Sequence, residues 1–89
     1  MFYVYILINH DKTRTYTGCT DNVERRLSEH NKGKVKTSKF YMPYTILHVE
    51  SFNTLPEARQ REKYYKSTSG RRLMKQFIGR VCPTKIIIN

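Results

Sequence analysis

The sequence predicts an α+β fold, in which a small three-stranded antiparallel sheet is flanked by helices in the order β-β-α-β-α-α. Three observations carry this prediction. Apolar and aromatic residues fill positions 2–8 and make up just over half of positions 44–52, and each run has the length of a strand. An Asp and a Thr are each followed by Glu three positions later, which is a helix-start signal. The 89 residues are enough for one small core and leave no room for a second domain.

The first strand is expected from Phe2 to Ile8, and the polar residues 9–14 then form a turn. Thr15 to Cys19 return as a second strand, which completes a β-hairpin. Because apolar side chains occupy both odd and even positions of the first strand, we expect both faces of the sheet to be covered and this strand to be central. The third strand is expected from Tyr44 to Phe52, directly after Pro43.

Capping signals place the first two helices. Asp21 is the expected N-cap of a helix from about Asn22 to His30. Thr54, with Glu57 three residues later, is expected to start a second helix from about Leu55 to Lys66.

The C-terminal region is expected to hold a third, short helix from Gly70 to Ile78 that ends at Gly79. Residues 1–79 then form one domain. Residues 80–89 are a C-terminal extension, for which a short strand, a dimer contact and a loosely held tail all remain open.

The charge of the chain points to a polyanionic partner. There are 17 Lys and Arg residues against 7 Asp and Glu residues, which gives a formal net charge of +10. Each basic side chain that reaches a phosphate releases condensed counterions, so nucleic acid is the expected partner. Basicity that serves only solubility, or that binds anionic lipid, is the alternative.

The cysteines and the hydropathy of the sequence indicate the cellular compartment in which we expect the protein. Cys19 and Cys82 lie far apart and make neither a metal-ligand spacing nor a disulfide framework, so they are expected to be reduced thiols. The longest apolar run, Phe2 to Ile8, is far shorter than the roughly 20 residues of a membrane-spanning helix, and no charged leader precedes it. We therefore expect a cytoplasmic protein that does not bind a membrane.

The first helix places polar residues where apolar ones are expected. Successive residues of a helix turn by about 100°, so Val23 and Leu27 define an inward stripe. Arg26 and His30 fall beside this stripe, one turn apart on a single face, whereas Glu29 is expected to point to solvent. A guanidinium and an imidazole are thus turned toward the sheet.

The second helix shows the same conflict at Glu62, which falls on the inward side seven residues after Leu55. A carboxylate there is costly unless it is paired or binds a metal, and a buried ion pair with Arg26 is the simpler explanation. Tyr5 and Tyr16 on adjacent strands are also ambiguous, because strand tyrosines are usually core residues. Together, however, two phenols, a guanidinium, an imidazole and a carboxylate form a plausible set for phosphodiester cleavage.

These residues resemble the motifs of the GIY-YIG nuclease superfamily, and in particular its small single-domain bacterial members and the N-terminal nuclease domain of the excinuclease C subunit. Tyr3-Val4-Tyr5 stands where the family has Gly-Ile-Tyr, and Tyr16-Thr17-Gly18 where it has Tyr-Ile-Gly. Arg26 and His30 have the family's spacing, and Glu62 stands at its metal-binding glutamate. The sequence departs from the pattern at Tyr3, in place of glycine, and at Cys19, where some relatives have Lys or Ser.

The resemblance implies a DNA endonuclease that uses one divalent ion, Mg²⁺ or Mn²⁺, with Glu62 as its protein ligand. It implies that Tyr16 activates or orients the attacking water, that Tyr5 hydrogen-bonds in the same cluster, and that Arg26 holds the scissile phosphate. His30 would relay a proton or bond the phosphate; an ordinary helix-end histidine is the alternative. Repair or recombination is the process in which such an enzyme would act.

A surface that tracks the phosphate backbone is expected outside this cluster, and its alternative is a solvated basic face. The expected nucleic-acid-binding residues are Arg26, Lys34, Lys36, Lys39, Lys66, Arg71 and Arg72. DNA is the expected partner, with RNA left open, and the chain is expected to be a monomer or a weak homodimer. The alternative function is a nucleic-acid-binding module that turns over poorly or not at all.

Overall fold

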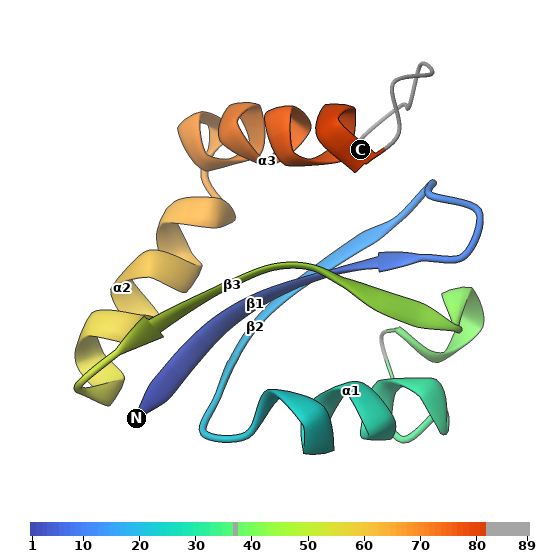
Figure 1. Ribbon diagram of the computed structural model, residues 1–89, viewed down its shortest axis with the longest axis horizontal. Coiled ribbons are helices and arrows are strands. Elements are labelled where there is room, and N and C mark those ends of the chain that lie inside the picture. The colour runs from blue at the N-terminus through green and yellow to red at the C-terminus, as the bar shows by residue number, and fades with distance from the viewer. Residues whose placement is uncertain (37, 82–89) are drawn as a thin grey trace.

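A computed structural model describes residues 1–36 and 38–81 and confirms the predicted α+β fold and the order of its elements. Three helices surround one sheet, with α1 and α3 on opposite faces and α2 at one end (Figure 1). The strands are β1 (Phe2–Asn9), β2 (Thr15–Thr20) and β3 (Tyr44–Phe52). The helices are α1 (Val23–Asn31), α2 (Leu55–Tyr65) and α3 (Thr68–Val81), with a 3₁₀ turn, η1 (Lys39–Tyr41), before β3.

The sheet has the order β2-β1-β3 and is antiparallel throughout. The prediction that β1 is central is therefore confirmed, and β2 and β3 form the two edges. In the hairpin register, Tyr5 lies opposite Gly18 and Leu7 opposite Tyr16. This register sets the positions of the two motif tyrosines.

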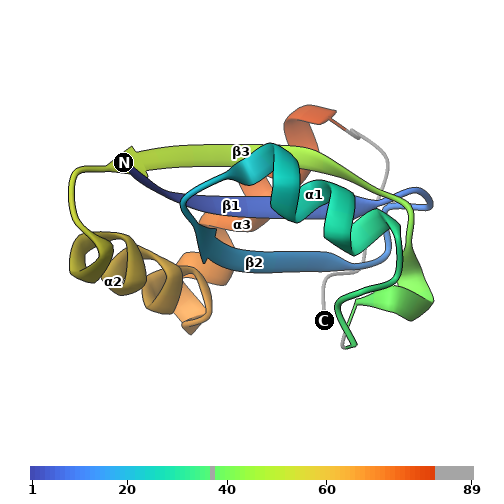
Figure 2. The ribbon, with the colours of Figure 1, turned by 90° about the horizontal axis from the view of Figure 1, so that it is seen from below.

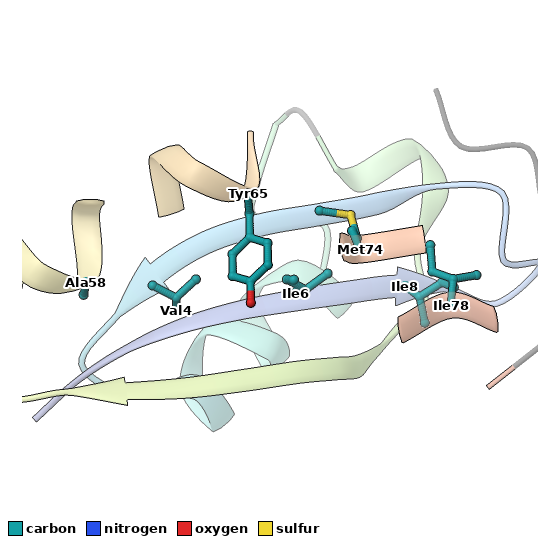
Figure 3. Close-up of a cluster of buried hydrophobic side chains, with 7 residues drawn as sticks. All are labelled: Val4, Ile6, Ile8, Ala58, Tyr65, Met74 and Ile78. Carbon is teal, nitrogen blue, oxygen red and sulfur yellow. The ribbon is translucent and has the colours of Figure 1, made fainter. Parts of the chain in front are cut away.

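Alternation along β1 divides the core into two layers, because successive side chains of a strand point to opposite faces. Val4, Ile6 and Ile8 pack against α2 and α3, where they meet Ala58, Tyr65, Met74 and Ile78 (Figure 3). Tyr5 and Leu7 point to the other face and pack with Tyr44 and the α1 residues Val23 and Leu27. The odd positions of β1 thus face the same side as α1.

The first helix begins one residue later than predicted. Asn22, not Asp21, is the N-cap of α1, and its side chain accepts a hydrogen bond from the Arg25 backbone N–H at 3.0 Å. Asp21 instead pairs with the Arg25 guanidinium at 2.7 Å. Asn22 has the extended backbone that an N-cap requires, so its amide oxygen reaches the helix end first. For α2, the predicted N-cap Thr54 is confirmed.

The third helix is longer than predicted at both ends. Only a short turn separates α2 from α3, which starts at Thr68, and Ser67 Oγ accepts from the Gly70 N–H at 3.3 Å. A Cβ at Gly70 would lie 2.5 Å from Tyr65 Cα, so glycine permits this sharp junction. Gly79 lies inside α3 rather than at its end. Residues 80 and 81 of the expected extension are helical, and the remainder, including Cys82, lies outside the described residues.

A polar cluster fastens α2 to β3. Glu50 accepts hydrogen bonds from Arg61 at 2.8 Å, from His48 at 2.7 Å and from the Tyr65 hydroxyl. The Arg61 guanidinium also stacks over the rings of Tyr64 and Tyr65. Because Arg61 precedes Glu62, this cluster fixes the helix turn that carries the candidate metal ligand.

The connection between α1 and β3 is the longest one within the described residues. Gly33 adopts a φ of +74°, which glycine takes without strain. Asn31 then bonds both backbone groups of Tyr44, donating to its carbonyl at 3.0 Å and accepting from its N–H at 2.6 Å. Ser38 lies buried between these points. Within residues 1–36 and 38–81, no helix is long and apolar enough to cross a membrane.

Candidate active site

A cleft of about 240 Å³ opens at the β2 edge of the sheet. It brings together Tyr5, Tyr16, Arg26 and Glu62, which come from β1, β2, α1 and α2. The helices α1 and α2 both approach this end of the sheet (Figure 2). Four of the five predicted catalytic residues therefore share one cleft, and the remainder of its lining is Gly18, Cys19, Leu55 and Arg59.

Gly18 makes room for the Tyr5 side chain. The two residues are cross-strand partners, and a Cβ at position 18 would lie 2.6 Å from Tyr5 Cζ. Real Cβ atoms do not approach other atoms so closely, so any larger residue at position 18 would displace the phenol. The glycine of the second motif is thus required by the tyrosine of the first.

Arg26 lies at the centre of the polar contacts. Its Nε donates to the Tyr5 hydroxyl at 3.3 Å, and its Nη1 donates to Glu29 at 3.0 Å. These two hydrogen bonds raise the pKa of the guanidinium, which stays charged. Glu29 was expected to face solvent; it stays partly exposed, and its ion pair with Arg26 lowers the pKa of its carboxyl.

A buried hydrogen-bonded chain leads from Arg26 through Tyr5 and His30 to Ser38. The Tyr5 hydroxyl lies 3.2 Å from His30 Nε2, and His30 Nδ1 lies 2.6 Å from Ser38 Oγ. Since Arg26 Nε can only donate, the Tyr5 oxygen accepts that bond and its own proton is left for His30 Nε2. We infer from this donor count that His30 carries its proton on Nδ1 and donates to Ser38, which in turn donates to the Val35 carbonyl at 3.4 Å.

His30 takes no part in lining the cleft. Its side chain is fully buried, and its ring lies edge-on to Tyr16, with centroids 4.4 Å apart. Burial, assisted by the Arg26 charge, lowers the pKa of the imidazole to about 4, so the ring is neutral near pH 7. His30 is therefore placed to position Tyr5 and Tyr16, not to touch a phosphate in the cleft.

The two tyrosines differ in how their hydroxyl groups are engaged. Burial raises the pKa of Tyr5 to about 12, against the opposing effect of Arg26, and both of its hydrogen bonds are made inside the protein. In contrast, no hydrogen bond to the Tyr16 hydroxyl occurs within the described part of the chain, and its side chain is only half-buried. Tyr16 is thus free to contact a water or a substrate atom.

Glu62 is the carboxylate of the cleft. It pairs with Lys66, one turn along α2, at 3.0 Å, so the alternative of an ion pair with Arg26 is wrong. Its side chain retains 22% exposure. No group of three metal-ligating side chains occurs among the described residues. One accessible carboxylate fits Mg²⁺ or Mn²⁺, because magnesium commonly keeps several waters and binds through one or two carboxylates plus substrate phosphate.

Two residues of this region were missed by sequence reasoning. Arg59 lines the cleft, and its spacing of three residues before Glu62 places both on one face of α2, a signal that was available. Ser38 is the buried partner of His30, but it lies in a loop, where spacing predicts no contact.

Cys19 lines the cleft as a free thiol. Burial raises the pKa of that thiol most strongly, and the negative charge of Glu62 raises it further. The thiol is therefore protonated near neutral pH. A protonated thiol is a poor nucleophile, so Cys19 is not suited to attack a phosphate in the cleft.

The predicted phosphate-tracking residues lie in two groups besides Arg26. Lys34, Lys36 and Lys39 follow α1, and Lys66, Arg71 and Arg72 surround the α2–α3 junction; all six are exposed. Figure 2 shows that both segments lie on the β2 side of the sheet. The cleft also opens at the β2 edge of the sheet.

A three-stranded sheet that gathers two tyrosines, an arginine and a glutamate in a cleft with a basic surround defines a nuclease-like domain. Residues 1–76 match the GIY-YIG catalytic domain, and the chain therefore belongs to the GIY-YIG family of nucleases.

Relatives agree with this assignment. A UPF0213 protein of Syntrophus aciditrophicus is 45% identical over 69 residues, which cover 75% of this chain and 78% of that protein. A UPF0213 protein of Natronomonas pharaonis is 44% identical over 68 residues, with 75% and 79% covered. The solution NMR structure of the UPF0213 protein BH0048 from Bacillus halodurans is similar with a TM-score of 0.51 and 27% identity, covering 98% of this chain and all of that chain (100%).

Proposed function

We propose that the protein is a divalent-metal-dependent endonuclease that hydrolyses phosphodiester bonds in DNA. The observation that carries the proposal is the cleft itself, in which Tyr16, Arg26 and Glu62 approach one another from three elements. A guanidinium for the phosphate, a free phenol for the water and a carboxylate for a cation are the groups that this hydrolysis requires.

Arg26 binds the scissile phosphate. Its guanidinium is held by Tyr5 and Glu29 through Nε and Nη1, which leaves Nη2 for phosphate oxygens. Since the positive charge is fixed before the substrate arrives, it stabilises the negative charge that develops in the transition state. Arg59, which also lines the cleft, adds a second positive charge.

Tyr16 orients the attacking water through its free hydroxyl. A phenolic hydroxyl can both donate and accept a hydrogen bond, so it can hold a water in line with the phosphate. Tyr5 has a different role, because its hydroxyl is held by Arg26 and His30. It keeps Arg26 in place, and the buried chain through His30 to Ser38 keeps Tyr5 in place.

Glu62 would hold one Mg²⁺ or Mn²⁺ ion with the help of waters and substrate oxygens. Such an ion, when bound, polarises the phosphate and lowers the pKa of a bound water. Lys66 must leave the carboxylate for this to happen, and an exposed pair of this kind contributes only about 0–1 kcal/mol.

The surrounding surface guides the nucleic acid. Arg26, Lys34, Lys36, Lys39, Lys66, Arg71 and Arg72 contact phosphates without reading bases. Residues 1–79 form the working domain, and the reaction serves DNA repair or recombination in the cytoplasm.

A binding module without turnover is the second candidate function. Two observations favour it: Glu62 is already paired with Lys66, and Cys19 occupies a cleft position that offers no cationic activator. The basic surface is common to both candidates, so only cleavage distinguishes them.

The test is a cleavage panel of labelled duplex, single-stranded, flap and branched DNA, each with Mg²⁺, Mn²⁺ or EDTA. We compare the wild type with Tyr16→Phe, which removes one hydroxyl, and with the control Tyr41→Phe, which makes the same change in η1. We expect metal-dependent products from the wild type and the control, and at least about tenfold slower cleavage by Tyr16→Phe. Binding of every substrate with no metal-dependent cleavage would favour the binding module.

A further inference from the structure

A second hollow lies beside the candidate active site. Its volume is about 350 Å³, and Tyr16 lines both this hollow and the cleft. Thr15 and Thr17 form its wall along β2, and Lys66, Arg71 and Met74 come from the α2–α3 side. We call it the Arg71 hollow. This size lies at the lower end of the range for small-ligand sites, about 300–1,000 Å³.

Apolar and cationic groups lie in different parts of the Arg71 hollow. Tyr65, which is fully buried, and Met74, which is nearly so, lie beneath its floor, and the half-buried side chain of Tyr16 is the aromatic group that a ligand can reach. The Tyr65 hydroxyl is turned away to Glu50, and the Met74 sulfur accepts from Thr15 Oγ1 at 3.3 Å. The rim is polar and cationic. An apolar floor under two positive charges suits a ligand with an anionic group on a flat or carbon-rich body, as in a nucleotide.

The two cationic side chains of the hollow, Lys66 and Arg71, differ in whether they already have an ion-pair partner. Lys66 spans the two sites, since it lines the Arg71 hollow while its ammonium pairs with Glu62 in the cleft. Arg71 forms no ion pair with any residue in the described ranges, and it is exposed. Its guanidinium is therefore available to an external anion. In addition, β2 is an edge strand, so the outward backbone groups beside Tyr16 are not used by the sheet.

Distance ties this hollow to the reaction. Thr15, in the hollow, and Gly18, in the cleft, are three residues apart on one strand, a separation of about 10 Å. A polynucleotide that places one phosphate at Arg26 therefore reaches the Arg71 hollow with a neighbouring nucleotide rather than a distant one.

We propose that the Arg71 hollow binds the nucleotide next to the scissile phosphate. Its phosphate is held by Arg71 and Lys66, and its sugar and base lie against the half-buried side chain of Tyr16, above the buried Met74 and Tyr65. This inference rests on the proposed nuclease function, and it adds to that function a subsite that sets which bond of the strand enters the cleft.

The test compares Arg71→Gln with Lys75→Gln. Both variants lose one exposed positive charge from α3, and Lys75 lies one helical turn after Arg71, but only Arg71 lines the hollow. Binding of a fluorescent thymidine oligonucleotide is measured in EDTA, over a range of salt concentrations, so that cleavage plays no part. Amide and methyl NMR shifts are recorded on the full chain with the same oligonucleotide and with thymidine 5′-monophosphate.

We expect Arg71→Gln to weaken oligonucleotide binding about tenfold and to reduce the slope of log K against log salt by about one, whereas Lys75→Gln changes binding by less than about twofold. Shifts of Thr15, Thr17 and Met74 should accompany binding. If thymidine monophosphate also shifts these residues, the hollow recognises a free nucleotide; if only the oligonucleotide does, it recognises a strand. Both outcomes support the subsite.

Equal weakening by the two variants would overturn the proposal, because the charges would then act only as a diffuse field. Shifts that avoid Thr15, Thr17 and Met74 would overturn it as well. A failure of the nuclease function is distinguishable: in that case the Arg71-specific binding persists in EDTA, while no substrate is cleaved with metal.

Discussion

The hydroxyl of Tyr5 lies close to the backbone of Gly18, where a larger residue would have its side chain. Gly18→Ala would put a methyl group where the phenol now lies. We expect this change to destabilise the protein by about 1–3 kcal/mol, because Tyr5 is buried and can move only by straining the core. Cleavage should fall as well, since the hydrogen bond from Arg26 to Tyr5 is lost.

Gly79→Ala is the matched control for this prediction. A Cβ at Gly79 meets nothing within 4 Å, and alanine is the better helix former by about 0.5–1 kcal/mol. Thermal melting and cleavage of both variants check the contrast. A Gly18→Ala protein with unchanged melting temperature and activity would show that Tyr5 is not held as described.

His30 makes stability depend on pH. Its pKa is lowered from about 6.5 in the unfolded chain to about 4 in the fold, chiefly by burial. Protons therefore bind the unfolded chain more strongly between these values, so the stability is complete above pH 6.5 and is lost as the pH falls toward 4. We expect about 2 kcal/mol less stability at pH 5 than at pH 7.5.

Urea denaturation at the two pH values measures this loss. His30→Gln keeps a hydrogen-bonding side chain but cannot titrate, so the difference between the two pH values should shrink sharply. His10→Gln, an exposed turn position, should keep the full difference. If His30→Gln shows the same pH dependence as the wild type, another group is responsible.

Candidate site residues could be predicted where a polar side chain fell at a helix position that was expected to be apolar. Arg26, His30 and Glu62 were singled out because polar groups fell on or beside the inward face of a helix, and the structure brings Arg26 and Glu62 into one cleft. Burial of His30 behind Tyr5 was not predictable, since it depends on Ser38, a loop residue that meets it only in the folded chain.

Glu50 on β3 connects this strand to helix α2 through hydrogen bonds from Arg61 and Tyr65. Its carboxylate is partly buried, and hydrogen bonds from Arg61, Tyr65 and His48 hold its pKa below the usual range against the opposing effect of burial. We expect Glu50→Gln to cost about 1–3 kcal/mol, because Arg61 loses its charged partner. Glu24→Gln, an exposed change in α1, should cost less than about 0.5 kcal/mol.

Chemical denaturation of the two variants gives these values. The cleavage rate of Glu50→Gln should also fall, since Arg61 adjoins Glu62 and fixes its helix turn. Equal stability of Glu50→Gln and Glu24→Gln would mean that the apolar packing of α2 alone positions Glu62.

Helix starts were predicted to within one or two residues because capping is local, yet the N-cap of α1 moved from Asp21 to Asn22. The full extent of α3 was not predictable. Its start depends on close packing of Gly70 against Tyr65, and Gly79 interrupts nothing in an exposed helical turn. The strands were predicted most closely, because β1 carries apolar residues on both faces.

Charge acts at the scale of the whole molecule. The net charge of +10 was readable from composition, but only the fold brings the segments that carry Lys34, Lys36 and Lys39 and Lys66, Arg71 and Arg72 to the β2 side of the sheet (Figure 2). We expect log K for DNA to fall with log salt with a slope of about −4 to −6. Replacing Lys34, Lys36 and Lys39 together by Gln should reduce the slope by up to about three.

Lys75→Gln is the control for this prediction, because Lys75 is an exposed α3 residue outside the proposed surface. Fluorescence anisotropy over a salt series measures each slope. A slope near zero for the wild type would contradict phosphate binding as the source of affinity.

The measurement that tests the central claim most directly is the single-turnover cleavage rate of Glu62→Gln, taken beside the wild type and Glu57→Gln. Both substitutions remove one carboxylate from α2, but Glu57 lies exposed in the first helical turn, where Gln serves equally well with the Thr54 cap. We expect Glu62→Gln to cut at least about a hundredfold more slowly, with binding changed by less than about threefold, and Glu57→Gln to cut as the wild type does. Cleavage by Glu62→Gln at the wild-type rate would contradict the account.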